Sequence, residues 1–91
     1  MRYIDVKWLH QHSEWPIRLR SEIDSDGYEI RKLEFFEDGS AGFACAATSQ
    51  LGVELGTVSV PSIVEIDAME EFEGKEISQA DFEALWTSVA G

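Results

Sequence analysis

Residues 28–43 read YEIRKLEFFEDGSAGF, and this stretch decides the fold. It divides into two runs rich in apolar residues, with Asp38 and Gly39 between them. An Asp-Gly pair between two such runs is typical of a tight β-turn. We therefore predict a β-hairpin here, and we expect the other segments of the chain to pack around it.

The alternation of polar and apolar residues changes phase within the first strand of this hairpin. Tyr28 and Ile30 fall on one face of the strand. Leu33 and Phe35 fall on the opposite face. Because side chains in a strand alternate with a period of two, the change predicts one of two features. These are a one-residue bulge near residues 31–32, or a strand that is buried on both faces at its far end.

Other segments of the chain also have the features of strands. Residues 3–9 and 17–23 alternate with a period of two, which predicts two half-buried strands. The cluster DSDG at residues 24–27 predicts the turn that leads into the hairpin. Small residues on both faces of residues 40–47 predict a strand that a helix covers closely. A further short strand is expected near residues 57–60, with a proline directly after it to end it.

The end of the chain has the clearest helix signal. Ser78 and Asp81 have the spacing of a capping pair. Ile77 and Phe82 have the spacing of a hydrophobic staple. These features predict an amphipathic C-terminal helix of roughly 11 residues. Its apolar stripe would be formed by Phe82, Leu85, Trp86 and Val89.

A second, shorter helix is expected at residues 62–69. Ser62 would be its N-cap, because Glu65 stands three positions later as in a capping box. Ile63, Ile66 and Met69 would form its apolar face.

Length and composition place these elements in one small domain. The chain has 91 residues, of which 44% are hydrophobic, which is enough for one core and too little for two. We therefore predict a single domain over residues 1–91 with an α+β fold. Its antiparallel sheet would have four to five strands, with the C-terminal amphipathic helix packed on one face.

The sequence shows neither an apolar run of the length that spans a membrane nor a leader of the kind that directs secretion. We therefore expect a cytoplasmic protein that does not contact membranes. The single cysteine, Cys45, agrees with this expectation, because it has no partner for an internal disulfide. It lies among small apolar residues, so we interpret it as a buried and unreactive thiol.

The formal charge of −11 is unevenly distributed along the chain. Residues 1–32 hold six of the seven basic residues and six acidic residues, so this part is neutral. Residues 33–91 hold twelve acidic residues against Lys75 alone. Such a charge repels nucleic acids and anionic membranes, and it favours basic proteins or cations as partners.

Acidic residues without nearby basic residues are the main candidates for a binding surface. Like charges destabilise a fold, so their accumulation favours a partner that gains from them. A solvated acidic face is the alternative interpretation. The spacing of these acids does not match a calcium-binding loop, and no metal or other cofactor is expected. The predicted partner-binding residues are Glu37, Asp38, Glu65, Asp67, Glu70, Glu71, Glu73 and Glu76.

His10 and His12 lie two positions apart beside Glu14. A metal site needs several such ligands, and no His or Cys cluster elsewhere in the sequence completes one. We interpret this segment as a solvated loop. The sequence has no nucleophile motif, no phosphate-binding glycine loop and no CxxC pair, so we assign no catalytic residue and do not expect an enzyme.

Basic residues in the strands have two interpretations. They can form a small patch that binds a phosphate, or they can pair across strands with acidic neighbours. Pairing is the commoner use of such residues, and we favour it. The residues concerned are Arg18, Arg20, Arg31 and Lys32, with Glu22, Glu29 and Glu34 as the expected partners.

Five segments together support a resemblance to a known family. They are VKWLH at residues 6–10, SEID at 21–24, EIRKLEFFEDG at 29–39, PSIVEID at 61–67 and EISQADFEALW at 76–86. On these segments the chain resembles a family of small, mostly bacterial domains of unknown function. The resemblance implies no activity and no catalytic residues. In size and charge the chain is also similar in general character to immunity proteins that neutralise toxins.

These observations support two hypotheses about function. The first is a non-enzymatic, antitoxin-like protein whose acidic surface docks on the basic active-site surface of a toxin such as a nuclease. The second is a small ligand-binding or enzymatic domain with a pocket between sheet and helix. The wall of the pocket in this second hypothesis would be formed by Trp8, His10, Trp15, Tyr28 and Arg31. Homodimerisation through a sheet edge is a third arrangement.

Overall fold

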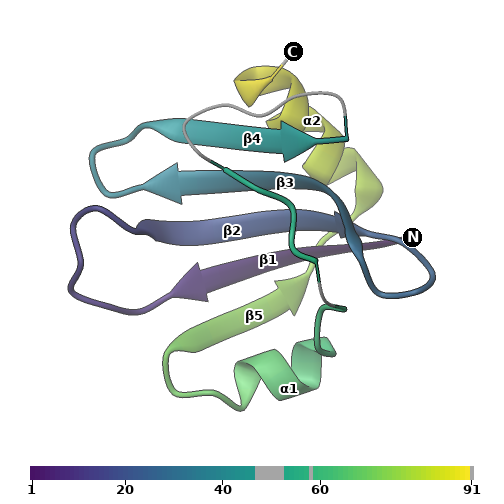
Figure 1. Ribbon diagram of the computed structural model, residues 1–91, viewed down its shortest axis with the longest axis horizontal. Coiled ribbons are helices and arrows are strands. Elements are labelled where there is room, and N and C mark those ends of the chain that lie inside the picture. The colour runs from purple at the N-terminus through teal and green to yellow at the C-terminus, as the bar shows by residue number, and fades with distance from the viewer. Residues whose placement is uncertain (47–52, 58, 91) are drawn as a thin grey trace.

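Residues 1–46, 53–57 and 59–90 are described by the structure, a computed structural model. They form a five-stranded antiparallel sheet and two helices (Figure 1). This confirms the predicted α+β fold with its C-terminal helix. In chain order the elements are β1 (Arg2–Trp8), β2 (Pro16–Ile23), β3 (Glu29–Phe36), β4 (Ala41–Cys45), α1 (Ile63–Asp67), β5 (Phe72–Glu76) and α2 (Gln79–Val89).

The strands lie in the order β4-β3-β2-β1-β5, and every neighbouring pair is antiparallel. The first four strands therefore form a meander, and the chain returns through α1 to place β5 beside β1 (Figure 1). The strands predicted at residues 3–9, 17–23 and 40–47 correspond to β1, β2 and β4. Residue 47 lies outside the described residues.

The fifth strand is not the one expected from the sequence. Thr57, Ser59 and Val60 lie outside helices and strands, so the predicted strand near residues 57–60 is wrong. The Val60 N–H donates instead to the carbonyl oxygen of Gly27, at 2.7 Å, in the turn between β2 and β3. The true fifth strand, β5, reads FEGKE. Its acidic residues and its glycine hide the alternation that identifies the other strands.

The change of phase in β3 arises from a β-bulge. Glu22 of β2 lies opposite Arg31, but the next residue, Ile23, lies opposite Glu29. Ile30 is therefore the extra residue and has no partner across the ladder. The predicted bulge is confirmed, one position before Arg31. It turns the apolar side chains that follow it toward the face covered by α2.

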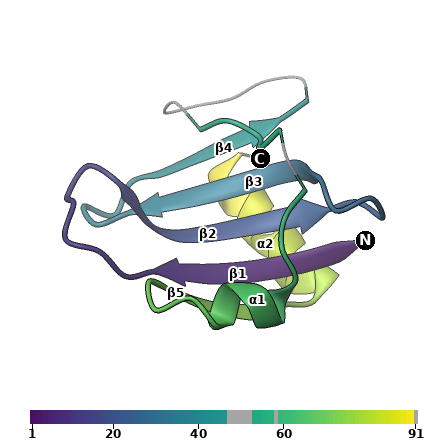
Figure 2. The ribbon, with the colours of Figure 1, turned by 60° about the horizontal axis from the view of Figure 1, so that its bottom comes forward.

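The sheet buries apolar side chains on both faces, and each face has its own core. Figure 2 shows the two helices on opposite sides of the sheet. Under α2 the buried residues are Tyr3, Leu33 and Phe82. Under α1 they are Ile4, Val6, Ile23 and Ile66.

Both helices begin as predicted. The Ser62 hydroxyl accepts a hydrogen bond from the Glu65 N–H at 3.3 Å, and α1 follows. The Ser78 hydroxyl accepts one from the Asp81 N–H at 3.0 Å, and α2 follows. Within the described residues, no helix is both long and apolar enough to span a membrane.

The apolar stripe of α2 packs on the sheet as the sequence predicts. Trp86 contacts Phe43 of β4 edge-on, with ring centroids 5.4 Å apart. The C-terminal helix therefore covers one face of the small-residue strand. The staple and stripe residues that belong to this core are Ile77, Phe82, Leu85, Trp86 and Val89.

Close packing of α1 on β5 depends on Gly74. A Cβ atom at this position would lie 2.8 Å from Cδ1 of Ile63 and 3.2 Å from Cγ2 of Ile66. The absence of a side chain therefore allows α1 to approach the strand. As a result α1 and β5 form one continuous edge of the fold (Figure 1).

Replacing Gly74 with alanine is expected to destabilise the protein by about 1–3 kcal/mol, because the new methyl group overpacks the contact between α1 and β5. Denaturant unfolding followed by circular dichroism measures the effect. The same substitution should cost less in an Ile63→Val background, since valine lacks the Cδ1 atom of the closest contact.

Glu73→Ala, at the neighbouring exposed position of β5, is the control for this experiment. It should change the free energy of unfolding by less than about 0.5 kcal/mol. Equal stability of Gly74→Ala and Glu73→Ala would contradict the role assigned to Gly74.

Candidate functional site

Carboxylates of the second half of the chain gather at the edge formed by α1, β5 and the loop between them. All of these side chains are exposed. Among the residues that the structure describes, none of them pairs with a basic side chain. We call this set the acidic edge, and its members are Glu65, Asp67, Glu70, Glu71, Glu73 and Glu76.

Asp67 also has a structural role within the acidic edge. Successive backbone N–H groups along a strand point to opposite sides. The Ile77 N–H donates to the Tyr3 carbonyl oxygen of β1, so the Gly74 N–H, three residues earlier, points away from β1. The Asp67 carboxylate accepts this N–H at 3.2 Å. The Phe72 N–H likewise donates to the Met69 carbonyl oxygen at 3.1 Å. These outward-facing donors are already satisfied, which disfavours pairing of β5 with another strand.

Exposed apolar side chains lie beside the acidic edge. Val64 of α1 is 75% exposed, and Met69 after it is 40% exposed. Leu9, 43% exposed, is held near them by a hydrogen bond from its N–H to the Glu71 carbonyl oxygen at 2.7 Å. A mixture of apolar centre and polar rim is the usual composition of a protein–protein interface.

Glu37 and Asp38 lie apart from the acidic edge. They occupy the turn between β3 and β4, on the far side of the sheet from β5 (Figure 1). Oδ1 of Asp38 accepts hydrogen bonds from the Ser40 hydroxyl at 2.6 Å and from the Ser40 N–H at 2.9 Å. These bonds, the hydroxyl first, hold the pKa of Asp38 below its ordinary value. The predicted partner-binding residues are thus divided between two corners of the sheet.

The five residues predicted to line a pocket do not come together. Trp8, His10 and Trp15 cluster near the loop between β1 and β2, where the two tryptophan rings stack with centroids 5.2 Å apart. Tyr28 lies at the opposite end of the strands, at the turn between β2 and β3. Arg31 lies beneath α2.

Both ring nitrogens of His10 are occupied. Nδ1 accepts a hydrogen bond from the His12 N–H at 3.0 Å, and Nε2 lies 2.7 Å from the Pro16 carbonyl oxygen. An accepting Nδ1 places the proton on Nε2, which donates it to Pro16. His10 therefore stabilises the loop between β1 and β2. Within the described residues, no group of three or more potential metal ligands occurs.

Cys45 is a free thiol of intermediate burial. The sequence predicted a buried thiol, and the difference has a simple cause. Cys45 is the last residue of β4, an outer strand of the described sheet, so it is covered less than a residue in the middle of the sheet.

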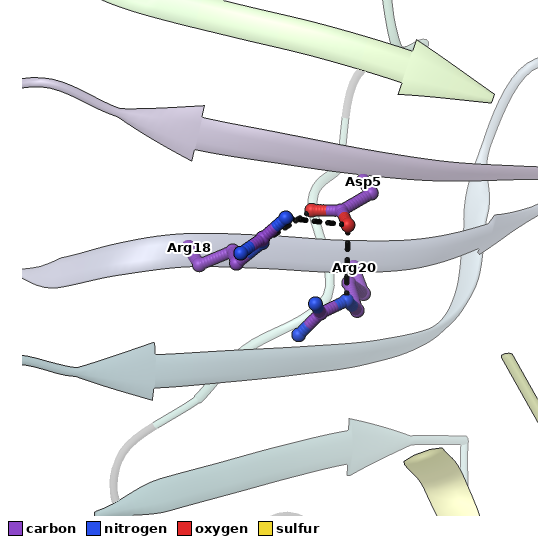
Figure 3. Close-up of polar contacts among 3 residues, drawn as sticks. All are labelled: Asp5, Arg18 and Arg20. Carbon is purple, nitrogen blue, oxygen red and sulfur yellow. Dashed lines mark hydrogen bonds and ion pairs between the residues drawn. The ribbon is translucent and has the colours of Figure 1, made fainter. Parts of the chain in front are cut away.

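An ionic cluster lies beside α2 on the sheet face that this helix covers. Asp5 of β1 is 4% exposed, and it accepts hydrogen bonds from Arg18 at 2.8 and 3.1 Å and from Arg20 at 3.3 Å (Figure 3). The sequence predicted that both arginines pair across strands, but it gave Glu22, Glu29 and Glu34 as the expected partners and did not identify Asp5. The alternation of β1 contained the signal, since it put Asp5 on the polar face of that strand.

A cavity of about 190 Å³ lies between α1 and the sheet. Apolar side chains of the core beneath α1 form most of its lining. At its polar end the Glu29 carboxylate accepts a hydrogen bond from the Ser21 hydroxyl at 2.8 Å and forms an ion pair with Lys32 at 3.0 Å. Lys32 thus pairs with an expected partner, but within its own strand. Among the described residues, this lining shares no member with the predicted pocket wall.

Comparison with models of protein families assigns the chain to one of them. The model of a domain of unknown function, DUF6881, matches residues 2–91. The chain belongs to this family. This confirms the resemblance to a domain family of unknown function that the five sequence segments indicated. No similar protein was found among those with curated descriptions, and none was found among solved structures.

A chain of polar contacts connects the strands to α2. The Tyr3 hydroxyl donates to Glu22 Oε2 at 2.7 Å. Arg31 donates to Oε1 of the same carboxylate and, at 2.7 Å, to Glu83 of α2. Its guanidinium lies over two aromatic rings of α2, 5.0 and 5.1 Å from their centroids. The pairing of Arg31 with Glu22 confirms the expected cross-strand contact.

These contacts shift the pKa values of the groups involved. The hydrogen bond from Arg31 is the main reason that the pKa of Glu22 lies below its ordinary value, and the Tyr3 hydroxyl acts in the same direction. The bond to Glu22 raises the pKa of Tyr3. At neutral pH the network is therefore charged and complete. It fixes three strands to α2, which is a structural role.

Replacing Glu22 with glutamine is expected to destabilise the protein at neutral pH by about 1–3 kcal/mol, because Arg31 and Tyr3 lose a charged acceptor. The pKa of Glu22 is lower in the folded chain than in the unfolded chain. Its stabilising contribution is therefore complete above the unfolded pKa of about 4.3 and is lost as the pH falls through the folded value. Denaturant unfolding at several pH values should show the deficit of Glu22→Gln shrinking toward low pH.

Glu83→Gln is the matched control, since the Glu83 side chain is 44% exposed. It should cost less than about 1 kcal/mol at neutral pH. A deficit of Glu22→Gln that does not change with pH would rule out the role given to its carboxylate.

Proposed function

We propose that this protein is a non-enzymatic binding protein whose acidic edge docks on a basic surface of another protein. The closest functional class is an antitoxin or immunity protein that covers the active site of a toxin. One observation supports the proposal above all others. Six exposed carboxylates share the edge formed by α1 and β5, and within the described residues none pairs with a basic side chain.

Electrostatics favours such a partner. The carboxylates of the acidic edge repel one another, and lysines or arginines of a partner would remove that repulsion. Complementary charge also steers diffusing partners, which raises the association rate and makes it sensitive to salt. A nuclease is one suitable class, because its active site must be basic to hold a phosphate backbone. The acidic edge would then occupy the place of the substrate and exclude it.

The construction of the edge favours binding as well. Gly74 lets α1 pack closely on β5, and Asp67 bonds to the backbone of the same strand. Both features hold the carboxylates in place before a partner arrives, so little conformational entropy is lost on binding. Val64 and Met69 provide exposed apolar area for the centre of the interface.

Glu37 and Asp38 belong to the proposal as a second point of contact. Their turn lies at the same end of the sheet as the loop before β5. The end of β3 pairs with the start of β2 (Phe36 with Pro16), and the start of β5 pairs with the end of β1 (Phe72 with Trp8). A partner that spans this end of the sheet, across the loop between β1 and β2, would contact both acidic corners.

Charge reversal tests the acidic edge. Affinity capture from the native host at low and high salt should recover a basic protein with the wild-type chain. The variant Glu70→Lys/Glu71→Lys should lose that protein, and binding by the wild-type chain should weaken at high salt because surface charge is screened. Glu73 is left unchanged, because it lies in β5 opposite Lys7 of β1 and its substitution would also alter that face of the sheet.

Asp26→Lys/Glu54→Lys is the matched control, because it changes the net charge equally at exposed positions away from α1 and β5. It should retain the captured protein. Capture that is indifferent to salt and to the Glu70 and Glu71 changes would refute the proposal.

The cavity beneath α1 favours a second candidate function, the binding of a small, mostly apolar ligand with one hydrogen-bonding group. Ser21, Glu29 and Lys32 would hold that group. In a thermal-shift screen of metabolites, such a ligand should raise the Tm of the wild-type chain. It should not raise that of Met69→Trp, whose larger side chain fills the cavity from its rim. A screen without any such compound counts against this candidate.

A further inference from the structure

The ionic cluster around Asp5 lies in a groove that is basic, although the protein as a whole is strongly acidic. One hollow of about 300 Å³ is lined by Asp5, Lys7, Arg18, Glu73, Gly74 and Lys75. A second hollow of about 380 Å³ shares Asp5, Arg18 and Lys75 with it and extends past Arg20 to α2. We call the two hollows together the basic groove.

The register of three strands brings four cations to this one place. Asp5 of β1 lies opposite Arg20 of β2 on one side and opposite Lys75 of β5 on the other. Lys7 lies opposite Arg18. A single buried carboxylate is therefore surrounded by four of the seven basic residues of the chain.

Asp5 orients the two guanidinium groups but leaves donors of both unused. Arg18 bonds to it through Nε and Nη2, and Arg20 bonds to it through Nε alone. Within the described residues, Nη1 of Arg18 and both Nη atoms of Arg20 make no hydrogen bond. The Arg20 guanidinium also lies over the Phe35 ring, 4.7 Å from its centroid. Its fork of donors is thus held in place before a ligand binds.

Lys7 and Lys75 add two exposed ammonium groups, and neither pairs with a carboxylate of the described chain. Burial lowers the pKa of Arg20, and the bond to Asp5 raises that of Arg18. Both guanidinium groups nevertheless stay charged at neutral pH. The acidic residues in the lining are Asp5, Glu73 and Asp81, so positive charge is in excess.

We propose that the basic groove binds a small phosphate monoester. The unused donors of the two arginines, together with Lys7 and Lys75, would hold the phosphoryl oxygens. The organic part of the ligand would lie against Ile77 and Leu85, where the Asp81 carboxylate accepts a hydrogen bond from a ligand hydroxyl. The basic groove is formed by this chain alone, so it does not require a protein partner at the acidic edge, with which it shares Glu73.

The arrangement selects for the size and charge of the ligand. Planar guanidinium forks and ammonium groups that converge from several strands suit a dianion with three terminal oxygens better than a carboxylate. A long polyanion such as a nucleic acid would be repelled by the rest of the protein, whose net charge is −11. A small phosphate ester receives the local attraction with little of that repulsion.

Titration of the isotope-labelled protein with glycerol 3-phosphate, followed by amide chemical shifts at constant ionic strength, tests the proposal. Saturable shifts are expected at the amides of Lys7, Arg18, Arg20 and Lys75. Lys75→Gln should raise the Kd about threefold to fivefold, the loss expected for one exposed charge contact. Sodium acetate at the same ionic strength should bind more weakly.

Lys32→Gln is the matched control, because it removes the same charge on the opposite face of the sheet, where Lys32 faces Ser21. It should leave the Kd unchanged, and Glu70→Lys/Glu71→Lys should still bind the phosphate ester. Shifts that do not saturate, equal affinity for acetate, or equal losses in Lys75→Gln and Lys32→Gln would overturn the assignment.

Discussion

Strand β1 must bury both of its faces, and the rest of the structure depends on this constraint. Ile4 and Val6 point into the core beneath α1, whereas Tyr3 points into the core beneath α2. Asp5 is buried among them, and a buried carboxylate is tolerable only when it is paired and hydrogen-bonded. Arg18 must therefore stand in β2 beside it. The single strand thus sets the requirements for both helices and for its neighbour.

The same constraint explains where the charge of the protein resides. The basic residues of β2 and β3 mostly pair inside the fold with carboxylates of β1, β2 and β3. Arg18 and Arg20 pair with Asp5, and Arg31 pairs with Glu22. Several carboxylates of the first part of the chain are thus neutralised within the fold. The acids of α1 and β5 have no such counterparts in the described structure, and they form the surface that a partner would meet.

The sequence predicted the elements whose signal is local. The caps of both helices and the stripe of α2 follow from spacing alone, and each was found where expected. The bulge in β3, one of two interpretations of its change of phase, was found one position before Arg31. The pairing of β5 with β1 depends on contacts between distant segments, and the acidic composition of β5 conceals its alternation. For the same reason the sequence placed Trp8 and Tyr28 in one pocket, although they lie at opposite ends of the strands.

The candidate sites were predictable only in part. Charge along the chain identified every member of the acidic edge, because those residues are neighbours in sequence, but it grouped Glu37 and Asp38 with them. The sequence offered Arg18 and Arg20 as members of a phosphate-binding patch, but it grouped them with Arg31 and Lys32, which do not line the basic groove. Lys7 and Lys75 were missed, because finding them requires knowledge of which strand lies beside which. Lys75 in particular is isolated among acids in sequence, yet the register places it opposite Asp5 and near Arg18. Sites assembled across a sheet become visible only once the strand order is known.

The bulge at Ile30 has a consequence for how this family can vary in length. In a regular strand, the loss of one residue moves every following side chain to the other face. Loss of Ile30 would instead leave the pairs Ile23–Glu29 and Glu22–Arg31 as consecutive steps of a regular ladder. A deletion at this position preserves both cores, whereas a deletion elsewhere in β3 exchanges them. Insertions and deletions that survive in β3 should therefore be concentrated at the bulge.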